Sequence, residues 1–442
     1  MYYSFVLPYM TDNNKIQVKK SKLRRTLRFS FYDGIFASIM FGCVQDYFTP
    51  FLLLIKGTVV QVGILSAIPN ITASILQIFS NRLVQIFKSR KTVFCIFVFL
   101  QALTLLACAV IFFIIYAIVP DTVSHCLLLI KQHQIEIFIT LVTLYTVFGS
   151  IGNPAWASLM SDLIPAHKRG KYFGFRNSIL GVLLVLVSLL VGIALRFSPT
   201  DYIMQTFVAI FLIASISRFI SWYYLTKMHE PPFAIESTHI LPPNILKNIK
   251  NNDFLLFIAF ISLMNFAVYL SAPFFAVLML QQLSFSYLEY SIITVSAPFI
   301  MYVAMHSWGT IADKIGNAKV LTITSPLIAI VPVLWVLDFH IGYLLIVQIF
   351  SGIVWSGFTI SSFNYMFDAS ASSKRVRYIS YFNLINGIMI SAGALCGGFL
   401  IQILPAVKGS SIYTILLVSA ILRLGITVVF AKRLKEMRLV ET

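Results

Sequence analysis

The sequence predicts an all-α polytopic membrane protein with twelve transmembrane helices in two pseudo-symmetric six-helix bundles. Composition, the length of the apolar runs and an internal repeat predict it. Of the 442 residues, 59% are apolar and 11% are charged, whereas a soluble domain has about 45–50% apolar and about 25% charged residues. A soluble protein is therefore excluded. Runs such as LLVLVSLLVGIAL (183–195) are also too long and unbroken for the ~10-residue alternating strands of a membrane barrel.

Twelve apolar runs are long enough to cross a bilayer, which takes ~20 residues per helix. Charged residues, prolines and glycines mark where each run ends. The predicted spans, numbered 1 to 12 in chain order, are residues 32–54, 60–80, 92–118, 136–159, 172–195, 202–225, 254–280, 290–311, 320–338, 343–366, 378–404 and 412–431.

Basic residues fall unevenly on the two sides of the predicted membrane. The chain has 33 Lys and Arg against 16 Asp and Glu, a net charge of +17. On the twelve-span map, 27 of these 33 lie on the side of the two termini, and the opposite loops hold four. Loops rich in Lys and Arg stay in the cytoplasm. We therefore predict a bacterial inner-membrane protein with both termini cytoplasmic, and no nucleic-acid partner.

The second half of the chain repeats the first. A polar segment with two Pro-Pro pairs, 226–253, separates predicted bundles at 1–225 and 254–442. DLIPAHKRGKYFGFRNSILG (162–181) aligns with DASASSKRVRYISYFNLING (368–387) at an offset of 206. Arg218 and Arg423 fall in the sixth span of each half. A parallel repeat of six spans is one transporter architecture, with the substrate site between the halves.

The loop after span 8 carries a family motif. GTIADKIGNAK (309–319) resembles the signature loop of the major facilitator superfamily, Gly-x-x-x-Asp-x-x-Gly-x-x-Lys/Arg. The segments 32–53 and 153–177 resemble a largely uncharacterised group of its bacterial members. The resemblance covers nearly the whole chain and implies two bundles that rock about a midplane cavity, lined mainly by spans 1, 4, 7 and 10.

The resemblance also implies a cytoplasmic gate. In that family the loop Asp meets the opposite half when the transporter is open to the outside. Asp313 is thus expected near the start of span 5, by Lys171 and Tyr172, whereas the first half has Gln85 where this Asp belongs. The predicted gate residues are Gly309, Asp313, Gly316, Lys319, Asp162, Arg169, Gly170, Asp368 and Arg375.

Asp46 is the first candidate for function. It lies 14 positions after Tyr32, or about 21 Å along a continuous helix, which places it inside the hydrocarbon. An ionisable group there is costly and usually functional. Asp46 is therefore expected to bind substrate or carry a proton. Pairing with a cation or polar groups, or a place at the outer mouth of the cavity, are the alternatives.

Other charged residues in the spans have structural interpretations. Arg218 and Arg423 either reach toward the cytoplasmic interface or pair with Asp162 and Asp368, the acids that end spans 4 and 10. Asp33, at the inner edge of span 1, is expected to be solvated.

Polar residues at helical spacing mark candidate cavity surfaces, although small and polar residues also pack membrane helices together. Gly393 and Gly397 in span 11 form a GxxxG, which we assign to packing. The candidate cavity residues are Gln45, Asn153, Trp156, Asn265, Tyr269, Ser356 and Thr359.

Enzyme motifs and metal-ligand spacings are absent from the sequence, so neither catalysis nor a cofactor or metal site is expected. We predict a monomeric secondary transporter that moves a small organic solute by alternating access and is coupled to protons through Asp46. A proton-driven multidrug efflux antiporter is one alternative. A receptor or scaffold with the same fold is an alternative of another class.

Overall fold

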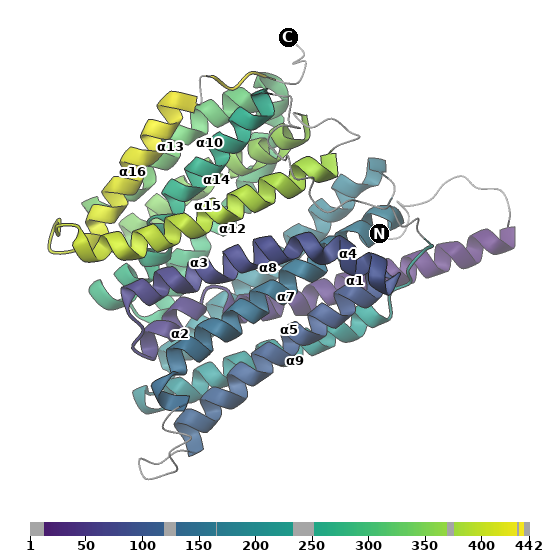
Figure 1. Ribbon diagram of the computed structural model, residues 1–442, viewed down its shortest axis with the longest axis horizontal. Coiled ribbons are helices and arrows are strands. Elements are labelled where there is room, and N and C mark those ends of the chain that lie inside the picture. Colours follow the sequence, from purple (N-terminus) through teal and green to yellow (C-terminus); the bar gives the residue numbers. More distant parts are fainter. Residues whose placement is uncertain are drawn as a thin grey trace.

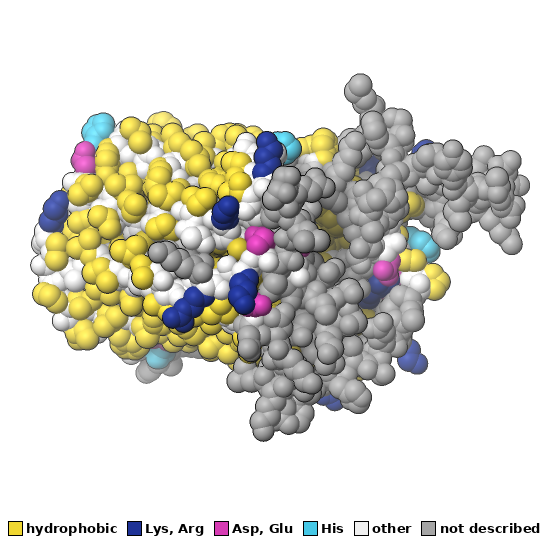
Figure 2. Space-filling model, turned by 90° about the horizontal axis from the view of Figure 1, so that it is seen from above, with side chains coloured by type: hydrophobic (Ala, Val, Ile, Leu, Met, Phe, Trp, Pro, Cys, Tyr) yellow, Lys and Arg dark blue, Asp and Glu magenta, His cyan; other side chains and the backbone are white. Residues whose placement is uncertain are grey.

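The computed structural model describes residues 13–118, 130–164, 166–232, 252–368, 375–430 and 433–436, which form helices and short connections (Figure 1). Within these ranges, 12 segments are long and apolar enough to cross a membrane. Each overlaps one predicted span, which confirms the twelve-helix class. Figure 2 shows the described surface of one face covered mainly by hydrophobic side chains, as expected for a protein surrounded by lipid.

The first six spans are formed by α1 (Asn13–Val44) with α2 (Phe48–Leu54), α3 (Val59–Leu76) with α4 (Ser80–Phe87), α5 (Arg90–Phe113), α7 (Gln134–Leu163), α8 (Ala166–Phe197) and α9 (Ile203–Thr226). The last six are α10 (Asn252–Tyr269) with short helical turns to Gln282, α12 (Tyr287–Ile315), α13 (Asn317–Leu337), α14 (Ile341–Asp368), α15 (Arg375–Ile403) and α16 (Ser411–Phe430). We call the end of the molecule where α1 starts and α16 ends the terminal face, and the other end the far face. The predicted linker 226–253 is described only up to residue 232 and from residue 252.

The two halves share one hydrophobic core toward the far face. There, a single buried cluster contains Tyr47 and Phe51 of the first half together with Phe274 and Trp335 of the second. Toward the terminal face, each half has a separate cluster, one around Leu159 and one around Phe257. Membrane helices associate through close van der Waals packing, so this shared cluster joins the halves at the far face.

Span 1 is broken between α1 and α2, at residues 45–47. Pro50 has no backbone N–H, so the carbonyl of Asp46 loses its donor four residues on. That carbonyl instead accepts a hydrogen bond from the Tyr290 hydroxyl of the other half, at 2.6 Å. The prediction of one continuous helix through Asp46 was wrong: the chain turns at residues 45–47, and Pro50 lies in the first turn of the new helix, where a missing N–H costs nothing.

Span 7 is broken at the corresponding place. α10 ends at Tyr269, and a turn at residues 270–271 precedes Pro273. Pro273 removes the donor that the Tyr269 carbonyl would have had. Pro50 and Pro273 are 223 residues apart, so the break belongs to the repeat. Paired breaks in two repeated halves are where many transporters bind substrate or ions.

The GxxxG of span 11 packs against this break, as predicted. A Cβ atom added at Gly393 would overlap the carbonyl oxygen of Phe266, and one added at Gly397 would overlap that of Leu270. On another side of α15, Gly398 lies close to Gly63 of α3. Spans 2, 11 and 7 thus approach at backbone distance.

Gly397→Ala is expected to lower the melting temperature of the purified protein. Its methyl group would meet a backbone oxygen that cannot move away as a flexible side chain would, and overpacking of this kind costs ~1–3 kcal/mol. Gly425→Ala is the control, because a Cβ at Gly425 meets nothing within 4 Å. Equal melting temperatures for the two variants would contradict the close packing of spans 7 and 11.

Candidate functional site

The break in span 1 joins the two halves at what we call the far-face joint: Asp46, Tyr47, Ser188, Tyr290 and Ser291. The Asp46 carboxylate accepts a hydrogen bond from the Ser188 hydroxyl of α8, at 3.1 Å. The Tyr47 hydroxyl lies 2.5 Å from the Ser188 carbonyl oxygen and 2.5 Å from the Ser291 hydroxyl of α12. A titratable carboxylate therefore lies at the contact that holds spans 1, 5 and 8 together.

Asp46 makes these contacts because the helix is interrupted at its own position. A continuous helix would use the Asp46 carbonyl internally, whereas here that carbonyl has no donor from its own helix and accepts from Tyr290. The side chain of Tyr47 is fully buried at 0% exposure, so its hydroxyl requires partners inside the protein. The sequence missed Tyr47, Ser188, Tyr290 and Ser291, because their roles depend on which spans meet across the halves.

A second polar network lies inside the first half, around Asp33. Asp33 is 5% exposed, so the prediction that it is solvated was wrong. The Ser221 hydroxyl donates to its carboxylate at 2.6 Å, and Arg218 donates to Ser221 at 3.0 Å. Arg218 also donates to Gln101 at 2.8 Å. The Arg176 guanidinium lies 3.7 Å from Asp33.

Arg218 therefore does not pair with Asp162, contrary to one of the two interpretations. Asp162 instead forms a 2.5 Å ion pair with Arg90, at the start of α5. Glu230, just beyond α9, accepts the backbone N–H of Arg90 at 2.8 Å and the Ser89 hydroxyl at 2.7 Å. A carboxylate at this position satisfies N–H groups that a helix start leaves free.

The second half repeats this arrangement at the terminal face. Glu436, beyond α16, accepts the backbone N–H of Ala318 at 2.8 Å, at the start of α13. Asp368 accepts from the Asn317 side chain at 3.0 Å, not from Arg423. Glu230 and Glu436 are 206 residues apart, the offset already seen between Asp162 and Asp368. That spacing was the signal in the sequence that could have found both glutamates.

Span 4 is exposed on two different sides of its helix, α7, and Asn153 lies on one of them. Thr140 and Leu144 are exposed on one side of α7, and Asn153 and Ala157 are exposed farther along. Leu144 and Asn153 are nine residues apart, or about two and a half turns, so they lie on opposite sides of the helix. We infer that one side meets lipid and the Asn153 side meets the space between the halves.

The other predicted cavity residues differ in their surroundings. Gln45 is exposed at the break in span 1, and Thr359 is exposed on α14. Trp156 is half-buried, and its ring lies beneath the Arg176 guanidinium at 4.9 Å.

Asn265 and Tyr269 are half-buried on α10, close to the break in span 7. Asn265 donates to Asn386 of α15 at 2.8 Å. Ser356 has 0% exposure, so its side chain lies inside the second half and not on an accessible surface.

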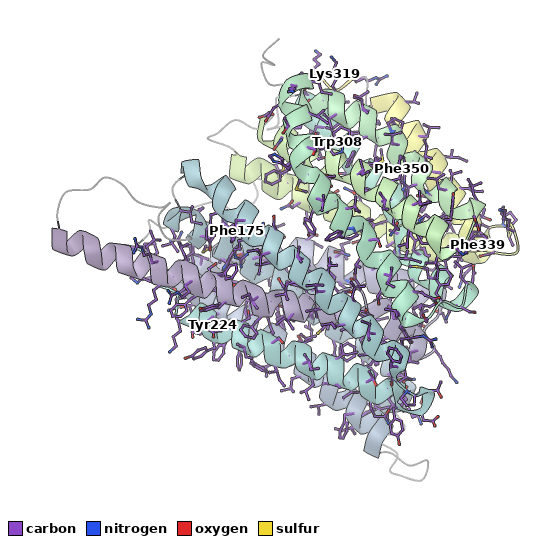
Figure 3. All side chains as sticks on the ribbon, turned by 180° about the vertical axis from the view of Figure 1, so that it is seen from behind. Phe175, Tyr224, Trp308, Lys319, Phe339 and Phe350 are labelled. Carbon is purple, nitrogen blue, oxygen red and sulfur yellow. The ribbon has the colours of Figure 1, made fainter. Side chains whose placement is uncertain are left out.

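Helices α8 and α12 touch at the far face and separate toward the terminal face. A Cβ added at Gly192 would overlap Ser291, and one at Gly181 would lie 3.3 Å from Tyr302. At Gly174 and Gly309, nearer the terminal face, a Cβ would meet nothing within 4 Å. Figure 3 shows Phe175 and Trp308, the neighbours of these glycines, lying apart on the two halves.

The predicted gate residues lie at this open end. Asp313 and Lys319 are exposed, and Gly316, with φ of 92°, separates α12 from α13. For Arg169, Gly170 and Arg375 the structure describes the helical backbone alone. α8 starts at Ala166, so the N–H groups without a partner inside the helix belong to residues 166–169. The expectation had placed the start of the helix farther along, near Lys171 and Tyr172.

Comparison with known proteins agrees with this architecture. The chain is similar to a mutant form of the nucleoside transporter NupG, with a TM-score of 0.69 and 13% identity over 92% of this chain and 100% of that one. A bacterial homologue of the iron transporter ferroportin, in an inward-facing state, gives a TM-score of 0.65 and 15% identity over 92% and 98% of the two chains.

A bacterial homologue of the human lysosomal transporter Spinster, inward-facing and unoccupied, gives a TM-score of 0.62 and 11% identity over 93% and 96%. No curated protein sequence matches the chain. At these identities the solved structures support the fold alone. The model of the Major Facilitator Superfamily, however, matches residues 34–277 and 255–438, which include both halves and the far-face joint. The chain therefore belongs to the Major Facilitator Superfamily.

Proposed function

We propose that this protein is a secondary transporter that moves a small organic solute across the bacterial inner membrane by alternating access, and that Asp46 couples this movement to protons. One observation carries the proposal: Asp46 lies at the joint that closes the far face. Protonation of its carboxylate would change the hydrogen bond to Ser188 and the charge next to the bridging Tyr47. Proton binding and opening of the far face would then be one event.

The packing of the halves supports alternating access. A shared hydrophobic core closes the far face, whereas each half has its own core toward the terminal face. A rocking motion would separate the halves at the far face and bring Gly174 and Gly309 together at the terminal face. Both glycines lack a side chain that would hinder such an approach.

The substrate can be sought by a thermal-shift screen of small organic solutes on the purified protein. A ligand that binds only the folded state stabilises it by RT ln(1 + [L]/Kd). Hits are then tested for transport in proteoliposomes with and without a pH gradient. A solute that binds but is never transported, under either condition, would favour the receptor or scaffold interpretation.

The proposed orientation places the terminal face in the cytoplasm. Single cysteines at Lys131 and Lys247, in a version without the native five cysteines, are expected to react from opposite sides with an impermeant thiol reagent. Lys131 belongs to the sparsely charged side, and Lys247 to the basic linker. Labelling of both from the same side would contradict the proposed topology.

A further inference from the structure

The two repeated arginines, Arg218 and Arg423, are both buried. Among the described residues, Arg218 has an acidic neighbour and Arg423 has none. Arg218 reaches the Asp33 carboxylate through Ser221. Arg423 is 3% exposed, and among the described residues its donors reach only neutral acceptors. These are the carbonyl of Ile328 at 3.2 Å, the carbonyl of Val268 at 3.5 Å and the hydroxyl of Ser271 at 3.1 Å.

The repeat explains why no acidic residue that the structure describes faces Arg423. Spans 1 and 7 correspond in the repeat, and their breaks lie 223 to 225 residues apart in the sequence. The positions of span 7 that correspond to Asp33 are therefore residues 256–258, which are Leu-Phe-Ile. Ile426 stands three residues after Arg423, where the first half has Ser221 after Arg218. On α13, Ile328 offers Arg423 only its backbone carbonyl, whereas Gln101 on α5 offers Arg218 a side chain.

Hydrogen bonding alone does not account for an arginine here. A neutral side chain such as glutamine can donate to the same carbonyls, and a buried charge without a partner is costly. In addition, the Arg423 Nε is buried and has no hydrogen-bond partner. Arg423 therefore keeps a buried charge and a buried N–H that no described group of the chain satisfies.

Arg423 is also placed where a substrate can be expected. Its guanidinium donates to the carbonyl of Val268 and the hydroxyl of Ser271, at the end of α10 where span 7 is broken. Broken spans in repeated halves are common substrate sites near the bilayer midplane. A planar guanidinium with several donors suits a carboxylate or phosphate oxygen pair.

We propose that Arg423 binds the anionic group of the substrate, so that the solute is an organic anion carrying a carboxylate or a phosphate. This inference rests on the proposed transport function and specifies its substrate class. In the first half, Asp33 already supplies a negative charge near Arg218. The second half leaves that place for the substrate.

Matched pairs of probes test the charge requirement. Binding of benzoate and benzamide, succinate and succinamide, and glycerol 3-phosphate and glycerol is measured by thermal shift and calorimetry at constant ionic strength. The anion of at least one pair is expected to bind at least tenfold more tightly than its neutral partner. Equal binding within every pair, or no binding of any anion, would overturn the proposal.

Variants test the residue. Arg423→Gln should weaken anion binding at least tenfold, and Arg423→Lys should retain part of it. Because Arg423→Gln can also loosen the break in span 7, Ile426→Asp provides a second test with Arg423 intact. An aspartate three residues on lies on the same face of α16 and would supply the missing counter-charge, so anion binding should again fall at least tenfold.

Ile426→Asn is the matched control and should bind the anion as the wild type does. Wild-type anion binding in Arg423→Gln or in Ile426→Asp would reject the proposal, as would equal losses in Ile426→Asp and Ile426→Asn. The proposed transport function is judged separately in proteoliposomes. Transport of a neutral solute would support the transport function and reject only the anion site. Anion binding without transport would support the anion site and reject the transport function.

Discussion

Asp46→Asn is expected to abolish accumulation of the substrate driven by a pH gradient, while exchange of substrate at equal pH continues. Asparagine resembles the protonated carboxyl group in shape and can still bind Ser188, but it cannot release a proton. With one proton per substrate, a gradient of one pH unit drives about tenfold accumulation. In proteoliposomes, the accumulation ratio is therefore expected to fall from ~10 to ~1.

Tyr47→Phe is the matched control for this experiment. It removes the hydroxyl that lies between Ser188 and Ser291 but keeps the titrating group. It is expected to change the rate of transport and to leave gradient-driven accumulation in place. Accumulation at the wild-type level in Asp46→Asn would eliminate Asp46 as the coupling residue, and loss of substrate binding would assign it to the substrate site.

The twelve spans could be predicted because a helix that crosses the bilayer needs about 20 predominantly apolar residues in a row. Such a run can be recognised in the sequence without knowledge of the fold. The breaks in spans 1 and 7 could also have been predicted from the sequence. Pro50 and Pro273 occupy matching positions in the two halves, and each proline removes one helical hydrogen bond.

The partners of the buried arginines could not be predicted from depth along the chain. Arg218 and Asp162 both belong to the inner half of their spans, yet Gln101 and Ser221 are the groups that contact Arg218. Which spans are neighbours, and which face of each helix they share, decides such contacts. The periodicity within one span indicates neither which spans are neighbours nor which faces meet. The far-face joint and the Asp33 network could therefore be found only in the folded structure.

Asp313→Asn is expected to shift the protein toward the state open to the terminal face. When the halves close there, the exposed Asp313 would meet the opposite half at the first turn of α8, residues 166–169, whose backbone N–H groups have no partner inside the helix. A carboxylate at a helix start contributes ~0.3–1 kcal/mol when exposed and up to ~2 when partly buried. Its loss would change the population ratio by up to ~30-fold.

Spin labels at Lys88 and Lys319, exposed residues of the two halves at the terminal face, would report this shift as longer distances. Asp338→Asn, which removes the same charge from the other end of α13, should leave the distances unchanged. Gln85→Asp adds a carboxylate at the matching place in the first half, so it should favour the closed terminal face and shorten them. If Asp313→Asn gives the wild-type distribution, Asp313 does not hold the two halves together, and the separate cores of each half must set the equilibrium alone.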